Sequence, residues 1–185
     1  YDEREVPELD IPALTTVQPI KVDMEDEQRQ HYLTAVEGLI NATGSLDDLE
    51  APWIRMRQIT SGYLSWRDAA GAHVVRFKAN PKLEALERLV LERGDGKMII
   101  CHEYTETGLM ISELLDKLKV KHLWLYGGAK NKDTMRDRFM HDPSLGVLLM
   151  NSASGGTGND GLQEVARYMV FYESPDRKST RLNSS

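Results

Sequence analysis

The chain has 185 residues, of which 41% are hydrophobic, and it carries a formal net charge of −6. This length suits one domain or one and a half, and the apolar share is enough to bury a core. No stretch approaches the ~18 apolar residues of a membrane span, and no secretory signal opens the sequence. The single cysteine, Cys101, excludes an internal disulfide framework and suits a reducing compartment. The five histidines are scattered, without the spacing of metal ligands.

The charge is concentrated at the N-terminal end. Residues 1–50 hold thirteen acidic and three basic residues, so the rest of the chain is slightly basic. The acidic total argues against a dedicated nucleic-acid coat protein. It leaves room for a local phosphate-binding groove, because salt screens charge effects beyond ~8–10 Å.

The first 79 residues predict a mixed, partly helical region. Residues 16–24 alternate enough for an extended strand, and Pro19 places it at a sheet edge. Helices are expected over 25–41, where acidic residues crowd the first turn, and over 49–60. Residues 61–77 read as a glycine-containing connection with a short strand over 73–77.

From residue 80 onward, helices and short apolar strands alternate. The helix over 80–94 has Asn80 as its N-cap, Pro81 at its first position and Gly94 past its end. The other expected helices cover 105–119 and 131–142, and the expected strands cover 97–102, 122–127, 146–151 and 168–174. The inward side of the helix over 105–119 is expected to carry Leu109, Ile111, Leu114, Leu115 and Leu118. The Met135, Phe139 and Met140 side chains should share one side of the helix over 131–142.

This alternation predicts an α/β fold, a parallel sheet with helices on both faces. Ligands of such sheets bind outside the carboxyl ends of the strands. The turns after His102, Gly127, Asn151 and Tyr172 should therefore lie on the edge that carries the site.

One of these turns is rich in glycine: "LLMNSASGGTGNDGLQ", residues 148–163. It is not an ATP-cradling P-loop, because no Gly-Lys-Ser/Thr follows the glycines. A dinucleotide fingerprint also fits poorly. The turn follows the third strand of the alternating half, and too little chain remains for the ribose acid and a second half-domain. A methyltransferase-type turn fails for the same positional reason.

Taken in order, the motifs from residue 80 resemble the second RecA-like lobe of superfamily-two helicases, specifically the Swi/Snf-related ATPases. The matching stretches are "NPKLEALERLV", "KMIICHEYTETGLMISELL", "LYGGAKNKDTMRDRFMHDP", "VLLMNSASGGTG" and "ARYMVFYESPD". Upstream, "KVDMEDEQRQHYL" and "MRQIT" resemble the segment that precedes this lobe. The resemblance covers roughly residues 5–175, and its strength comes from the order and spacing of the pieces.

The resemblance implies a role for several residues. Ser152 matches a hydroxyl that contacts a DNA backbone phosphate, and Gly128 and Arg136 join it as expected nucleic-acid contacts. Gly156 and Gly158 would approach the ATP cleft. After Gly158 the sequence departs from the family pattern by about two extra residues. The polar residue expected near the ribose of ATP is therefore either Asn159 or Asp160. A hydroxyl and backbone N–H groups can grip phosphate without reading bases.

The elements that hydrolyse ATP are missing from the chain. Phosphoryl transfer needs a phosphate-cradling lysine, a Mg²⁺-binding acid and an arginine finger. In the family the first two lie on the first lobe. The arginine-finger helix follows the last strand, where this chain reads "RKSTRLNSS". We therefore expect no catalytic and no metal-binding residues here. ATP and Mg²⁺ belong to a full-length parent, whose partners are DNA and its own first lobe, with no membrane.

The resemblance also predicts how the chain is divided. Residues 1–79 are an inter-lobe helical region, and residues 80–175 are the second RecA-like lobe. Residues 176–185 can be back-translated into a string that resembles a common sequencing adapter and are taken as non-native, with a natural basic tail as the alternative. The chain is expected to be a piece of a cytoplasmic DNA-dependent ATPase and double-stranded DNA translocase. The compact "FYESPD" form points to a bacterium or a phage-infected cell.

Alternative interpretations stay open at this stage. The chain could be a non-catalytic nucleic-acid-binding or scaffolding module with a degenerate lobe, or a small-molecule nucleotide-binding enzyme. Arg136 could reach nucleic acid or pair with Asp133. Cys101 and His102 are read as a core thiol beside a histidine at the rim, because strand neighbours point to opposite faces. Trp124 is expected in the core, whereas Trp53 and Trp66 are either base-stacking platforms or packing residues.

Overall fold

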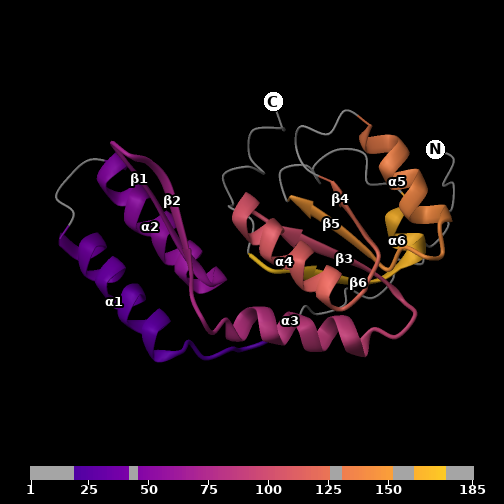
Figure 1. Cartoon of the computed structure of the whole chain (residues 1–185), viewed down its shortest axis with the longest axis horizontal. Helices are drawn as coiled ribbons and strands as arrows, with labels where there is room; N and C mark the ends of the chain where they lie inside the picture. The colour runs from indigo at the N-terminus through magenta and orange to yellow at the C-terminus, as the bar shows by residue number, and fades with distance from the viewer. Residues whose placement is uncertain (1–18, 42–45, 126–130, 152–160, 174–185) are drawn as a thin grey trace, which may run out of the picture.

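The computed structural model describes residues 19–41, 46–125, 131–151 and 161–173 of the chain. Figure 1 shows two parts: two helices with a β-hairpin at one end, and a sheet flanked by helices at the other. Helix α3 (Pro81–Glu92) connects them and runs along the sheet. Within the described ranges, no helix is both long and apolar enough to cross a membrane.

The first part consists of α1 (Asp26–Asn41), α2 (Leu46–Ser61), and the antiparallel strands β1 (Tyr63–Asp68) and β2 (Gly71–Arg76). Helices α1 and α2 pack together, and the buried Gln28 side chain donates from Nε2 to the carbonyl of Ile59 at 2.6 Å. This hydrogen bond gives a carbonyl in the last turn of α2 a donor and holds α1 against α2.

Two expectations for this part were wrong. Residues 19–25 form no strand, and Ile20 is 59% exposed there, so no neighbouring strand or core covers that stretch. Residues 63–68, read as a connection, instead form β1 and pair with β2 from Tyr63 opposite Arg76 to Asp68 opposite Gly71. The strand expected over 73–77 is confirmed as β2.

The second part is a four-stranded parallel sheet in the order β4-β5-β3-β6. Its elements in chain order are β3 (Lys97–His102), α4 (Thr105–Lys117), β4 (His122–Leu125), α5 (Lys132–His141), β5 (Val147–Asn151), α6 (Leu162–Val165) and β6 (Ala166–Phe171). This confirms the expected α/β fold. The four-residue helix α6 was not predicted from the sequence.

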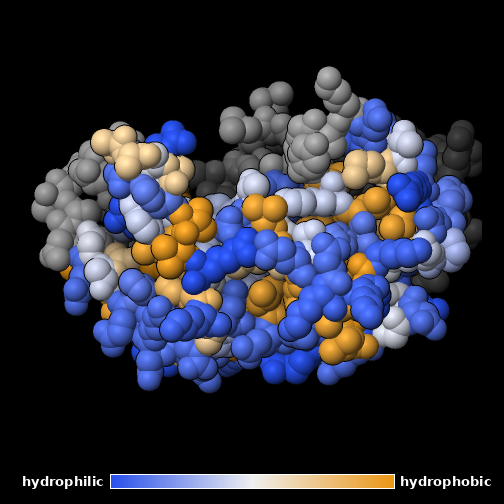
Figure 2. All heavy atoms as spheres, in the orientation of Figure 1, coloured by the Kyte–Doolittle hydropathy of each residue, from blue (hydrophilic) through white to orange (hydrophobic). Residues whose placement is uncertain are grey.

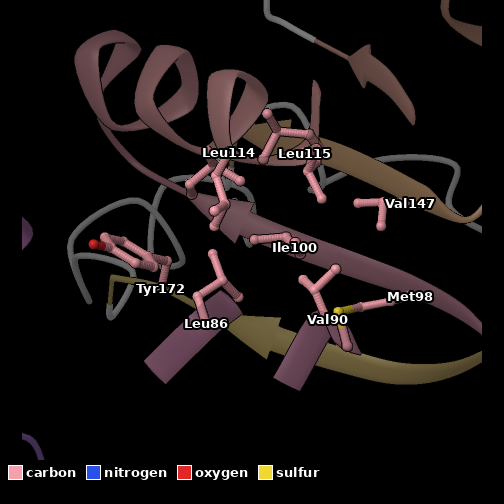
Figure 3. Close-up of a cluster of buried hydrophobic side chains, with 10 residues drawn as sticks. Leu86, Val90, Met98, Ile100, Leu114, Leu115, Val147 and Tyr172 are labelled. Atoms are coloured by element: carbon pink, nitrogen blue, oxygen red, sulfur yellow. The ribbon is translucent and has the colours of Figure 1, made fainter. Parts of the chain in front are cut away.

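The strands bury opposite faces in alternation, as the period of two requires. On one face, Met98 and Ile100 of β3 and Val147 of β5 pack under α3 and α4. Figure 3 shows Leu86 and Val90 of α3 approaching Ile100 from one side, with Leu114 and Leu115 of α4 on the other. On the opposite face, Ile99, Cys101, Leu148 and Met150 pack with Phe139 of α5 and Leu162 of α6. Helices therefore cover both faces.

Local sequence signals explain the helix ends and faces. The Asn80 Oδ1 atom accepts from the backbone N–H of Leu83 at 3.1 Å, which confirms the expected N-cap of α3. On α4, Ile111, Leu114 and Leu115 are buried as expected, and Leu118 packs against the same core. Leu109 is 39% exposed, so its inward placement was wrong. On α5, Phe139 is fully buried and Met135 and Met140 pack against the same cluster, as expected.

The visible surface is mainly polar. On the face drawn in Figure 2, hydrophobic residues form small patches that are separated by hydrophilic ones. The apolar side chains are thus gathered mainly in the two layers beside the sheet.

Candidate functional site

The parallel strands bring three chain segments to one edge of the sheet. Strand β3 ends at His102, β5 ends at Asn151, and β6 leads into Tyr172 and Glu173. Because these strands are parallel neighbours, their carboxyl ends meet at the same edge, as the sequence predicted. The β3–α4 turn, which contains Glu103, lies between them.

A buried carboxylate organises this edge. Glu173 is only 4% exposed, and its Oε2 accepts from the backbone N–H groups of Glu103 at 2.7 Å and Tyr104 at 3.3 Å. Its Oε1 accepts from the hydroxyls of Thr107 at 2.7 Å and Ser61 at 2.5 Å. A buried charge is tolerated only with such partners. Glu173 therefore fixes the β3–α4 turn and ties α2 to the sheet.

Two buried phenols, Tyr63 and Tyr172, feel the charge of this carboxylate. Burial, and secondarily the charge of Glu173, raises the pKa of Tyr63 above its ordinary value. Burial likewise raises the pKa of Tyr172, whose hydroxyl donates to the carbonyl of Ser61 at 3.3 Å. Both phenols therefore stay protonated at neutral pH and serve to hold the edge together, with no role as bases.

His102 is locked as a neutral side chain. Trp124 donates from Nε1 to His102 Nε2 at 3.1 Å, and His102 Nδ1 lies 3.0 Å from the carbonyl of Tyr104. The first contact makes Nε2 the acceptor, so Nδ1 carries the hydrogen and donates it in a hydrogen bond to the carbonyl oxygen of Tyr104. Burial lowers the pKa of His102, which supports the same assignment.

His102 is 1% exposed, so its expected place at the rim was wrong. The short turn folds back over the ring, and Trp124 closes the other side. Cys101 is buried in the opposite layer as expected, and burial raises its pKa to about 11. A protonated thiol on the other face cannot form a nucleophile–base pair with His102. The partly buried Trp124 packs against the core, as expected.

Helix α4 approaches this edge closely through a glycine. A Cβ on Gly108 would lie 2.4 Å from Trp124 Cζ2 and 2.6 Å from His102 Cε1. Such distances are well inside van der Waals contact. Gly108 is therefore the residue that lets α4 seat against the histidine–tryptophan pair.

The last residue of β5 is tied to the turn after β3. The Asn151 Nδ2 atom donates to the carbonyl of Glu103 at 2.6 Å. Asn151 is therefore anchored to the turn that Glu173 holds. Ser152, Gly128, Gly156, Gly158, Asn159 and Asp160, which the sequence predicted as binding residues, all lie outside the described residues.

Arg136 is the one expected binding residue that the described ranges include. It lies on α5, its side chain is 22% exposed, and Nη2 donates to Asp133 Oδ1 at 2.7 Å. This ion pair is one of the two arrangements that the sequence left open. An exposed pair at this spacing is worth ~0.3–0.5 kcal/mol, so it would not prevent a phosphate contact. Its role in nucleic-acid binding stays a prediction.

Cations lie over two tyrosines at this edge. The Arg57 guanidinium is 5.4 Å from the ring centre of Tyr104, and Lys82 Nζ is 4.6 Å from that of Tyr172. Burial lowers the pKa of Lys82, the charge of Arg57 adds to this, and Glu173 opposes it. The edge thus combines a buried negative charge with two cations.

Sequence reasoning missed Glu173, Ser61 and Thr107. An acidic residue directly after an apolar strand was the available signal for Glu173. Its partners Ser61 and Thr107 are separated from it by 112 and 66 residues, so no local pattern connects them. In the portion of the chain that the structure covers, no group of three or more His, Cys, Asp or Glu side chains is placed to hold a metal ion.

Two solved structures from Sulfolobus solfataricus are similar to this chain. A SWI2/SNF2 ATPase C-terminal domain has a TM-score of 0.66 and 17% identity, covering 82% of this chain and 68% of that one. A SWI2/SNF2 ATPase core domain has a TM-score of 0.66 and 16% identity, covering 86% of this chain and 34% of that one. The chain has the RecA-like fold of these domains. It spans about a third of the core domain, at 34%.

The similarity is seen in the structure and not in the sequence. No protein-family model matches the chain, and no curated protein is similar to it. The shared fold therefore rests on the sheet order and the helices that cover it.

Proposed function

We propose that this chain is the C-terminal RecA-like lobe of a DNA-dependent ATPase of the SWI2/SNF2 type, which translocates on double-stranded DNA. Residues 80–175 form the lobe, and residues 1–79 form the region that links it to a first lobe. The lobe contributes phosphate-backbone contacts and one wall of the ATP cleft. Hydrolysis itself requires the first lobe.

The observation that carries this proposal is the position of Asn151, the residue that precedes the glycine-rich segment in the sequence. Asn151 lies at the carboxyl end of β5, next to β3, and is held by the turn after β3. Ligands of open parallel sheets bind at this edge. A hydroxyl at Ser152 and successive glycine N–H groups are suited to phosphate. The fold shared with SWI2/SNF2 ATPase domains supports the same assignment.

The chemistry of ATP hydrolysis does not fit the described residues. They include no group of three or more metal-ligating side chains and no Gly-Lys-Ser/Thr of a phosphate-cradling loop. ATP and Mg²⁺ would be held mainly by the first lobe, with Gly156, Gly158 and Asn159 or Asp160 facing them from this one. We therefore derive no hydrolytic step from this chain and expect it to show no DNA-stimulated ATPase activity alone.

The experiment compares Ser152→Ala with the unchanged 185-residue chain. The readout is the fluorescence anisotropy of a labelled DNA duplex at low salt. We expect Ser152→Ala to weaken binding about tenfold, since hydrogen bonds to charged groups contribute ~1.5–3 kcal/mol. Ser144→Ala is the control, because Ser144 lies in the exposed turn before β5, at the opposite edge of the sheet. Equal affinities for Ser152→Ala and the unchanged chain would contradict the proposal.

A further inference from the structure

A second candidate site lies away from the sheet, between α1, α2 and β1. A cavity of about 460 Å³ opens there. Its walls include His31, Thr34, Arg55, Ile59, Trp66 and Arg67. Cavities of ~300–1,000 Å³ hold small molecules, so this one has room for a single nucleotide unit and none for a duplex.

The lining of the cavity is basic. Arg55, Arg67 and His31 are among its lining residues, and the described lining residues include no carboxylate. The whole chain carries a net charge of −6, so this composition runs against the average of the molecule. Guanidinium groups are the preferred partners of phosphate oxygens. The cavity is therefore suited to an anionic ligand.

One wall is a fixed aromatic platform. The Trp66 side chain is 39% exposed and stacks on His73, with ring centres 5.1 Å apart and planes inclined by 16°. His73 is itself held, because its Nε2 lies 3.0 Å from Asp68 Oδ1. With one face of the indole taken by His73, a base can extend the stack only on the opposite face. Stacking on aromatic side chains is how proteins hold unpaired bases.

We propose that this cavity binds one unpaired nucleotide of a single nucleic-acid strand. The base stacks on Trp66, and a flanking phosphate pairs with Arg55. The inference rests on the proposed function only in that nucleic acid is the partner. It uses none of the residues at the carboxyl edge. Arginine and tryptophan together favour a nucleotide over an acidic peptide, because a peptide carboxylate would leave the indole face unused.

The test measures binding of a fluorescein-labelled oligodeoxythymidylate ten nucleotides long to the 185-residue chain. We expect Trp66→Ala to weaken binding about tenfold, and Trp66→Phe to weaken it less. Arg55→Ala should reduce the slope of log affinity against log salt by about 0.7. Trp53→Ala is the matched control, because Trp53 is 54% exposed on α2 and does not line the cavity. A thermal melt of each variant identifies those that fail to fold.

Three results would overturn the proposal. The first is equal affinity of Trp66→Ala and Trp53→Ala for the oligonucleotide. The second is a Trp66-dependent affinity for a matched duplex that equals the single-strand affinity. The third is stronger, Trp66-dependent binding of poly-glutamate, which would assign the cavity to acidic peptides.

Ser152→Ala separates this inference from the proposed function. We expect this variant to keep its affinity for the oligonucleotide while losing affinity for the duplex. If the chain binds the oligonucleotide through Trp66 but does not bind duplex DNA, the cavity proposal stands and the proposed function is contradicted.

Discussion

The hydroxyl of Ser61 and the carboxylate of Glu173 are joined by a hydrogen bond of 2.5 Å. Ser61 is the last residue of α2, and Glu173 follows β6, so this contact ties the helical region to the sheet. The carbonyl of Ser61 also accepts from Asn80 Nδ2 at 3.0 Å. The two parts of the chain are therefore held together next to the edge that carries the candidate site.

Removing the carboxylate should destabilise the fold strongly. Glu173→Ala leaves the buried hydroxyl of Thr107 and the backbone N–H groups of Glu103 and Tyr104 without this acceptor, whereas the Ser61 hydroxyl keeps the carbonyl of Arg57 at 2.9 Å. Each unsatisfied buried group costs ~1–3 kcal/mol, so we expect a loss of about 3 kcal/mol or more in the free energy of unfolding. Urea denaturation measures it, with the exposed Glu164→Ala as control. A loss under about 1 kcal/mol would show that these contacts do not carry the stability assigned to them.

Adding a methyl group at Gly108 should also destabilise the protein. The new Cβ would overlap Trp124 and His102, and overpacking of this kind costs ~1–3 kcal/mol. Gly38→Ala is the matched control: Gly38 lies inside α1, and a Cβ there meets nothing within 4 Å. Because alanine favours helix, that variant should gain up to ~1 kcal/mol. Equal effects of the two substitutions in urea denaturation would contradict the close approach of α4.

Stability should fall on mild acidification because of His102. Its pKa is lowered by burial in the folded protein, whereas the unfolded chain has the ordinary value of 6.5. The unfolded state therefore binds the proton first, and stability drops as the pH falls below that value, by at most ~1.4 kcal/mol per pH unit.

The measurement is the free energy of unfolding between pH 7.5 and 5.0. His102→Gln lacks the titrating group, so its profile should be flatter over this range. Parallel profiles for the unchanged chain and His102→Gln would contradict the buried neutral histidine. The carboxyls of Asp68, Glu113 and Asp142 have lowered pKa values, so their contributions are lost at lower pH than that of His102.

Arg136 offers a test of where DNA runs on this lobe. If it contacts a phosphate, Arg136→Ala should weaken duplex binding and reduce the salt slope by about 0.9. The control is Arg138→Ala on the same helix, whose side chain is 64% exposed. We expect the change only for Arg136. An unchanged slope would leave Arg136 as the ion-pair partner of Asp133 alone.

The sequence predicted the sheet because its signals are local. The run 97–102 is apolar and short, and Asn80 with Pro81 marks a helix start without any distant partner. Strand β1 was missed because Arg67 and Asp68 interrupt its apolar alternation, and its support comes from pairing with β2 and packing against α2. Helix α6, with four residues, is too short to show a period.

The candidate site was predictable in place and unpredictable in detail. Parallel topology sends the strand ends to one edge, so Asn151 and the turn after His102 were expected there. The burial of His102 depends on Trp124 from the next strand and on Gly108 of α4. Contacts of this kind are set by packing, which the order of residues along the chain does not express.

The most direct test of the account is the affinity of the 185-residue chain for two DNA duplexes of unrelated sequence, measured from 50 to 200 mM salt. A lobe that grips the phosphate backbone should bind both duplexes equally and lose affinity steadily as salt rises. An affinity for neither duplex, or a strong preference for one sequence with little dependence on salt, would contradict the assignment of this chain as a DNA-translocating lobe.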